Sequence, residues 1–88
     1  MRIKRGFVVR SVGGQKYAVA TGEVAKSFRG MLKINDMGEF IFNLLSENTT
    51  VDDVVSAILK EYDADENVVR VDVENFVSQL RTINIIED

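Results

Sequence analysis

The first third of the chain carries short runs with the composition and alternation that are typical of β-strands. The runs 7–12 and 15–20 flank the pair Gly13-Gly14. Two glycines between such runs favour a two-residue hairpin, because its turn needs residues with positive φ. In the predicted register, one face carries Val8, Arg10, Tyr17 and Val19, and the other carries Phe7, Val9, Ala18 and Ala20.

Residues 31–34 predict a third strand, which follows a connection without clear periodicity at 21–28. The side chains of this strand alternate between two faces, with Leu32 and Ile34 on one and Met31 and Lys33 on the other. As the last strand of a small sheet it is an edge strand, and one row of its backbone N–H and C=O groups has no partner.

The rest of the chain has apolar residues at helical spacing, which predicts three helices. Asn35 or Asp36 caps the first helix, Thr50 caps the second, and the third runs from about Glu66 to Thr82. The predicted buried stripes are Met37, Phe40, Ile41, Leu44 and Leu45, then Val51, Val54, Val55, Ile58, Leu59 and Tyr62, then Val69, Val73, Phe76, Val77 and Leu80.

These elements predict one domain of the α+β class over residues 1–88. A three-stranded antiparallel sheet, made of the N-terminal hairpin and the edge strand, packs on three helices in a winged helix-turn-helix-like arrangement. Asn84 is expected to stop the third helix in the left-handed conformation. The pair Ile85-Ile86 either forms a short terminal strand or packs on the core.

Two valines break the pattern of the third helix. At about 100° per residue, Val71 lies opposite the buried stripe and Val68 lies on its flank. Single exposed apolar residues are common on protein surfaces. The alternative is a second, partly apolar helix face that another molecule covers.

The residue types present argue against catalysis. The sequence has no histidine and no cysteine, which removes the commonest general base, the thiol nucleophile and the usual metal ligands. Paired carboxylates such as Asp52-Asp53 lie where helix caps and first turns favour acids. We therefore expect no catalytic residues, no metal and no cofactor. No apolar run is long enough to span a bilayer and no signal peptide is visible, so we expect a cytoplasmic protein without a membrane partner.

Charge is strongly segregated along the chain. Residues 1–34 contain eight Lys or Arg and one acid, a net charge of +7, whereas residues 35–88 contain three bases and thirteen acids, a net charge of −10. Such segregation is either a solvated surface whose signs happen to separate or a dipolar cleft where the two halves meet.

Two binding functions are compatible with this fold. A winged-helix DNA-binding regulator would present the third helix to DNA, but that helix carries Glu66, Asp72 and Glu74, which repel phosphates. An exposed strand edge instead accepts an extended peptide as an additional strand. The edge strand carries Arg29 and Lys33, so the two walls of the groove have opposite charge, and a peptide with charges of both signs would be oriented between them.

Three stretches of the sequence resemble the PqqD family. The run at 30–42 with Leu44-Leu45 follows the hairpin as it does in that family, and the run 72–80 matches the pattern Asp-Val-x-x-Phe-hydrophobic-x-x-Leu. The ending at 83–86 has asparagine where a glycine is common. The order and spacing of these stretches cover nearly the whole chain.

The resemblance implies a small winged-helix-like domain, also called a precursor-peptide recognition element. Such a domain is a non-catalytic chaperone that binds the leader segment of a ribosomally made precursor peptide and delivers it to a modifying enzyme. That enzyme is often a radical S-adenosylmethionine protein, a cyclase, a dehydratase or a leader protease, and no nucleic acid is involved. The peptide-binding groove that the resemblance implies has Arg29, Met31, Leu32, Lys33 and Ile34 on one wall and Val68, Val71, Asp72, Asn75 and Phe76 on the other.

Overall fold

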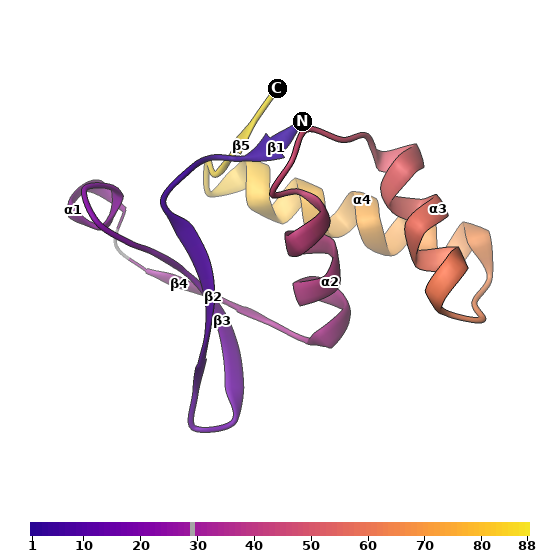
Figure 1. The fold of residues 1–88 in the computed structure, drawn as a ribbon, viewed down its shortest axis with the longest axis horizontal. Coiled ribbons are helices and arrows are strands. Elements are labelled where there is room, and N and C mark those ends of the chain that lie inside the picture. The colour runs from indigo at the N-terminus through magenta and orange to yellow at the C-terminus, as the bar shows by residue number, and fades with distance from the viewer. Residues whose placement is uncertain (29) are drawn as a thin grey trace.

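The fold is α+β, with a hairpin that projects from a layer of helices (Figure 1). The computed structural model of the chain describes residues 1–28 and 30–88. The elements are β1 (Arg2–Ile3), β2 (Phe7–Val12), β3 (Gln15–Ala20), α1 (Val24–Ser27), β4 (Met31–Ile34), α2 (Asp36–Leu44), α3 (Val51–Glu61), α4 (Glu66–Thr82) and β5 (Ile86–Glu87).

The main sheet is three-stranded and antiparallel, in the order β2-β3-β4. The predicted hairpin register is confirmed, because Val8 pairs with Val19 and Arg10 pairs with Tyr17. The turn glycines have φ of 58° and 81°, values that favour glycine over residues with a Cβ. The predicted third strand is confirmed as β4, which pairs with β3 only, among the strands of the described residues.

A second, two-stranded sheet joins the two ends of the chain. β1 pairs antiparallel with β5, with Ile3 opposite Ile86. The amide of Ile3 also donates to the Leu45 carbonyl at 2.8 Å, which ties the first strand to the end of α2. The sequence left the state of Ile85-Ile86 open and did not predict β1, because two residues are too few to show a strand period.

The three long helices begin at capping residues. Asn35, not Asp36, caps α2, because its Oδ1 accepts the Gly38 amide at 2.8 Å. Thr50 caps α3 as predicted, and α4 covers the predicted range Glu66–Thr82. The connection predicted at 21–28 contains one helical turn, α1.

The core lies where α2, α3, α4 and the small sheet meet. Its most deeply buried large side chains are Ile41, Leu45, Ile58, Leu80, Ile85, Val54, Val55 and Val73. Two side chains depart from the predicted stripes. Phe42 is buried although the stripe omitted it, and Tyr62 is exposed and makes an edge-to-face contact with Phe40, with 5.6 Å between the ring centroids. The half-buried members of the stripes, which lie at the margin of the core, are Met37, Phe40, Leu44, Val51, Leu59 and Phe76.

α2 and α4 approach closely beside the end of β4. A Cβ at Gly38 would lie 3.2 Å from the Ile34 Cβ and 3.4 Å from Cε1 of Phe76. A glycine inside a first helical turn is costly, and here it allows the α4 ring to pack against α2. At the far end of α4, Asn84 has φ of 63°, which confirms the predicted left-handed stop.

Candidate peptide-binding edge and pocket

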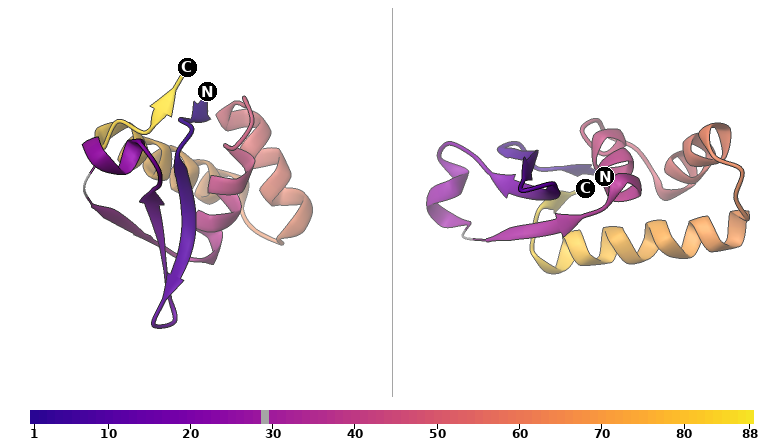
Figure 2. Two further views of the ribbon diagram at one scale, coloured as in Figure 1. Left: turned by 60° about the vertical axis from the view of Figure 1, so that its left-hand side comes forward. Right: turned by 90° about the horizontal axis from the view of Figure 1, so that it is seen from below.

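β4 forms one edge of the main sheet, and this edge lies on the side of α4. In the right-hand view of Figure 2, β4 lies between the β2–β3 hairpin and α4. One row of the β4 backbone groups pairs with β3, and the other row has no strand partner within residues 1–28 and 30–88. β4 therefore offers a short template for one more strand, which α4 flanks.

The two faces of β4 differ in exposure. Ile34 is buried and Leu32 is half-buried against the core, so these two residues offer their backbone rather than their side chains. Met31 and Lys33 are exposed on the outer face of the sheet. The fifth residue of the predicted strand wall, Arg29, lies outside the described residues.

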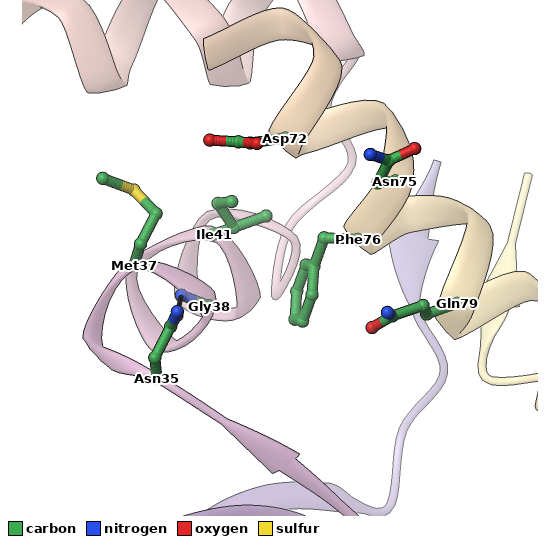
Figure 3. A pocket seen from close by; sticks show the side chains of 8 residues that line it. All are labelled: Asn35, Met37, Gly38, Ile41, Asp72, Asn75, Phe76 and Gln79. Atoms are coloured by element: carbon green, nitrogen blue, oxygen red, sulfur yellow. Dashed lines mark hydrogen bonds between the residues drawn. The ribbon is translucent and has the colours of Figure 1, made fainter. Parts of the chain in front are cut away.

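A pocket of about 300 Å³ opens between the first turn of α2 and the middle of α4 (Figure 3). It is lined by Asn35, Met37, Gly38, Ile41, Asp72, Asn75, Phe76 and Gln79. The structure thus brings together three residues of the predicted helix wall, Asp72, Asn75 and Phe76. In Figure 3, Phe76 lies between Asp72 and Gln79 with its ring directed toward α2.

Neither exposed valine of α4 lines this pocket. Val68 and Val71 are 59% and 56% exposed. Val68 precedes Asp72 by four residues and Val71 precedes Asn75 by four. At about 100° per residue, Val68 lies within the arc of the helix that the four pocket residues of α4 span, and Val71 lies about 40° outside that arc, beyond Asn75. Val68 therefore extends the pocket face toward the start of α4, and Val71 lies at its margin.

Sequence reasoning missed the wall that α2 contributes and one residue of α4. Gln79 follows Asp72 by seven residues and Asn75 by four, a spacing that places it on the same face. The signal for the α2 wall in the sequence is Gly38, because a glycine inside a helix is costly and indicates that another element packs closely there. The positions of Met37 and Ile41 at the pocket follow from how α2 crosses α4, which no local pattern reveals.

The outer face of the main sheet presents two rows of side chains. Val8, Val19 and Met31 are aligned across the three strands, and the next row is Arg10, Tyr17 and Lys33. Side chains directly opposite one another across strands lie close enough to interact. The outer face is thus an apolar row beside a row that places one aromatic ring between two cations.

An ion-pair cluster fixes the sheet to the start of α2. The ammonium group of Lys16 donates to Glu39 Oε1 at 2.6 Å and to Asp36 Oδ1 at 3.0 Å. The hydrogen bonds to Glu39 and Asp36 raise the pKa of Lys16 above its usual value. This cluster lies beside the turn from β4 into α2, and so it holds the corner at which the strand edge meets the pocket.

Both arginines of α4 are bound to carboxylates of the chain itself. Arg70 contacts Asp52 at 2.6 Å, and Arg81 contacts Asp88 at 2.8 Å. These hydrogen bonds raise the pKa of both arginines, and Arg81 lowers the pKa of Asp88. The helix that a winged-helix regulator would place on DNA therefore has its basic groups neutralised and its remaining exposed charges acidic.

Within the described residues, no three or more Asp, Glu, His or Cys side chains gather as a set of metal ligands. The helices of that part of the chain are too short or too polar to cross a bilayer.

Comparisons with known proteins bear on the fold and, separately, on the family of this chain. No curated protein matches the chain in sequence. The solved structure of TbiB1 in complex with the TbiA(beta) leader peptide matches with a TM-score of 0.74 and 22% identity, over 99% of this chain and 95% of TbiB1. At that identity the likeness shows the shared fold. The family of coenzyme PQQ synthesis protein D (PqqD) matches residues 15–86, so the chain belongs to the PqqD family.

Proposed function

We propose that this protein is a peptide chaperone that binds the leader segment of a ribosomally made precursor peptide and delivers it to a modifying enzyme. The leader adds to β4 as a fourth strand of the main sheet, and the protein itself carries out no chemistry. The observation that carries the proposal is the open edge of β4 next to the pocket between α2 and α4.

Strand addition suits this edge for physical reasons. Main-chain hydrogen bonds to β4 supply affinity for an extended chain whatever its sequence, and a side-chain pocket beside the strand supplies specificity. The pocket starts at Asn35, the residue directly after the last residue of β4. A peptide strand that runs along β4 therefore comes close to the pocket.

Membership of the PqqD family and the likeness to TbiB1, whose structure contains a leader peptide, support the same function. The binding groove that we propose contains the strand residues Arg29, Met31, Leu32, Lys33 and Ile34 and the helix residues Val68, Val71, Asp72, Asn75 and Phe76. Within it, the pocket residues and Val68 are the side chains that the geometry favours most.

Delivery needs a surface that stays open when the leader is bound. The β2 side of the main sheet, with Val8 and Arg10 on its outer face, is such a surface, because β3 separates it from the open edge of β4. A modifying enzyme, such as a radical S-adenosylmethionine protein, a cyclase or a leader protease, contacts this surface. Arg10→Glu should therefore weaken the ternary complex without changing leader affinity.

The test of the function is a titration by calorimetry at low salt. Synthetic leader peptides encoded beside the gene are compared with a scrambled leader and with a mixed-sequence DNA duplex. We expect one leader to bind with 1:1 stoichiometry, and neither the scrambled peptide nor the duplex to bind appreciably. Duplex binding that weakens steeply with salt, together with no leader binding, would replace the peptide function by the DNA-binding one.

A further inference from the structure

The pocket between α2 and α4 has a distinct charge. Asp72 is its one charged lining residue, and no Lys or Arg of the described residues lines it. Asp72 forms no ion pair with a described side chain, whereas the acids Asp36 and Glu39 nearby are both bound by Lys16. Within the described residues, the pocket therefore presents a negative charge that no Lys or Arg compensates.

The rest of the lining combines apolar surface with amide groups. Met37, Ile41 and the ring of Phe76 supply the apolar part, and Asn75 and Gln79 supply carbonyl oxygens that accept hydrogen bonds. Gly38 contributes to the space, because a Cβ there would lie 3.3 Å from Oδ1 of Asn35 and 3.4 Å from the ring of Phe76. The site thus has a nonpolar wall and an acceptor-rich rim.

This combination fits a long cationic side chain better than any other natural type. Lys and Arg carry an apolar stem that packs on nonpolar surface and a charged head that bonds to a carboxylate. The head also gains from the face of an aromatic ring. An acidic side chain would be repelled by Asp72, and a purely apolar one would leave its carboxylate without a partner.

We propose that this pocket takes a Lys or Arg side chain of the leader, and that Asp72 is the residue that selects it. The inference rests on the proposed peptide-binding function. The selected residue lies where the leader passes the end of β4, because the pocket begins at Asn35. Asp72 thereby selects the residue type at one position of the leader, and it also sets the register in which the leader pairs with β4.

The experiment is a charge exchange with a matched control. The synthetic leader that binds is first scanned with alanine, and we expect its largest losses to include one Lys or Arg. Asp72→Lys should then weaken the native leader by at least ten-fold, and replacing the selected basic residue of the peptide by Glu should restore at least ten-fold with this variant alone. Glu74→Lys is the control, because Glu74 is also an exposed acid of α4 but does not line the pocket.

Three outcomes separate the proposals. Rescue of Asp72→Lys by the Glu peptide supports the basic subsite. A leader that binds tightly but contains no sensitive Lys or Arg, or equal losses for Asp72→Lys and Glu74→Lys, overturns the subsite and leaves the peptide function intact. Failure of every encoded leader to bind the unaltered protein overturns both. Unchanged circular dichroism and thermal midpoints of the two variants exclude unfolding as the cause.

Discussion

At the residue scale, two residues matter mainly through their backbone, and these are Gly38 and Asn84. Gly38 allows α2 and α4 to meet beside the strand edge, since its missing Cβ leaves room for the Phe76 ring. Asn84 ends α4 with a positive φ and turns the chain back so that β5 can pair with β1. Gly38 therefore affects the pocket, and Asn84 affects the stability of the fold.

We expect Gly38→Ala to reduce leader affinity more than it reduces stability. Alanine is favoured over glycine in a helix by about 1 kcal/mol, and contacts of 3.2–3.4 Å around the new Cβ offset that gain. The free energy of unfolding should change by less than about 1 kcal/mol. The tightest of these contacts are with the Ile34 Cβ at 3.2 Å and the Asn35 Oδ1 at 3.3 Å, at the corner where the strand edge meets the pocket. These two residues have to shift, so leader affinity should fall by about five-fold or more, or about 1 kcal/mol. Asn43→Ala, at an exposed position of the same helix, is the control, and equal affinities of the two variants would contradict the role of Gly38.

Asn84 allows a test of the backbone alone. Both Asn84→Ala and Asn84→Gly remove the hydrogen bond from the Lys4 ammonium group, which is 3.1 Å long. Only alanine is strained in the left-handed region, at a cost of about 1–2 kcal/mol. Urea denaturation should therefore show the alanine variant less stable than the glycine variant by about 1 kcal/mol. Equal stabilities would mean that residue 84 tolerates a Cβ in this turn.

At the element scale, α4 has two working faces. One face is buried in the core through Val69, Val73, Val77 and Leu80. The other lines the pocket and continues to Val68 one turn earlier. A helix that only packed on the core would favour polar residues on this second face. Phe76 packs against the core, so Val68 is the apolar residue of this face that our proposal explains by a bound peptide.

The two exposed valines should differ in their effect on binding. Val68 lies within the arc that the pocket residues of α4 span, and Val71 lies about 40° outside it, beyond Asn75. Val68→Asp should weaken leader binding by roughly ten-fold, or about 1.4 kcal/mol, while Val71→Asp should change it by less than two-fold. Isothermal titration of both variants with the same leader measures the difference. A larger loss for Val71→Asp would place the peptide on another face of α4.

The elements of this protein could be predicted from the sequence where a local pattern determines them. Alternation and the Gly13-Gly14 turn predicted the hairpin register, and helical spacing predicted the exact range of α4. The wall that α2 gives to the pocket could not be predicted, because it depends on the angle at which two helices cross. The resemblance to the PqqD family, rather than a local pattern, indicated Asp72, Asn75 and Phe76 as groove residues, and it did not indicate Met37 and Ile41.

At the scale of the whole molecule, the positive and negative halves of the chain meet at the corner of β4 and α2. Lys16 of the sheet binds Asp36 and Glu39 there, so this part of the charge separation is compensated within the fold. Asp72 remains uncompensated among the described residues on the helical side, and Lys33 does so on the outer face of the sheet. A leader of mixed charge would therefore be oriented before its strand is formed.

The central claim is that the leader adds to the edge of β4, although the sheet has a second open edge at β2. Amide hydrogen exchange, followed by NMR with and without the encoded leader, tests this choice directly, because a new ladder protects the amides that join it. We predict that alternate amides of Met31–Ile34 become protected when the leader binds, while the exchange rates of Phe7–Val12 stay unchanged. Protection along β2, or leader binding without new protection on β4, would contradict the account.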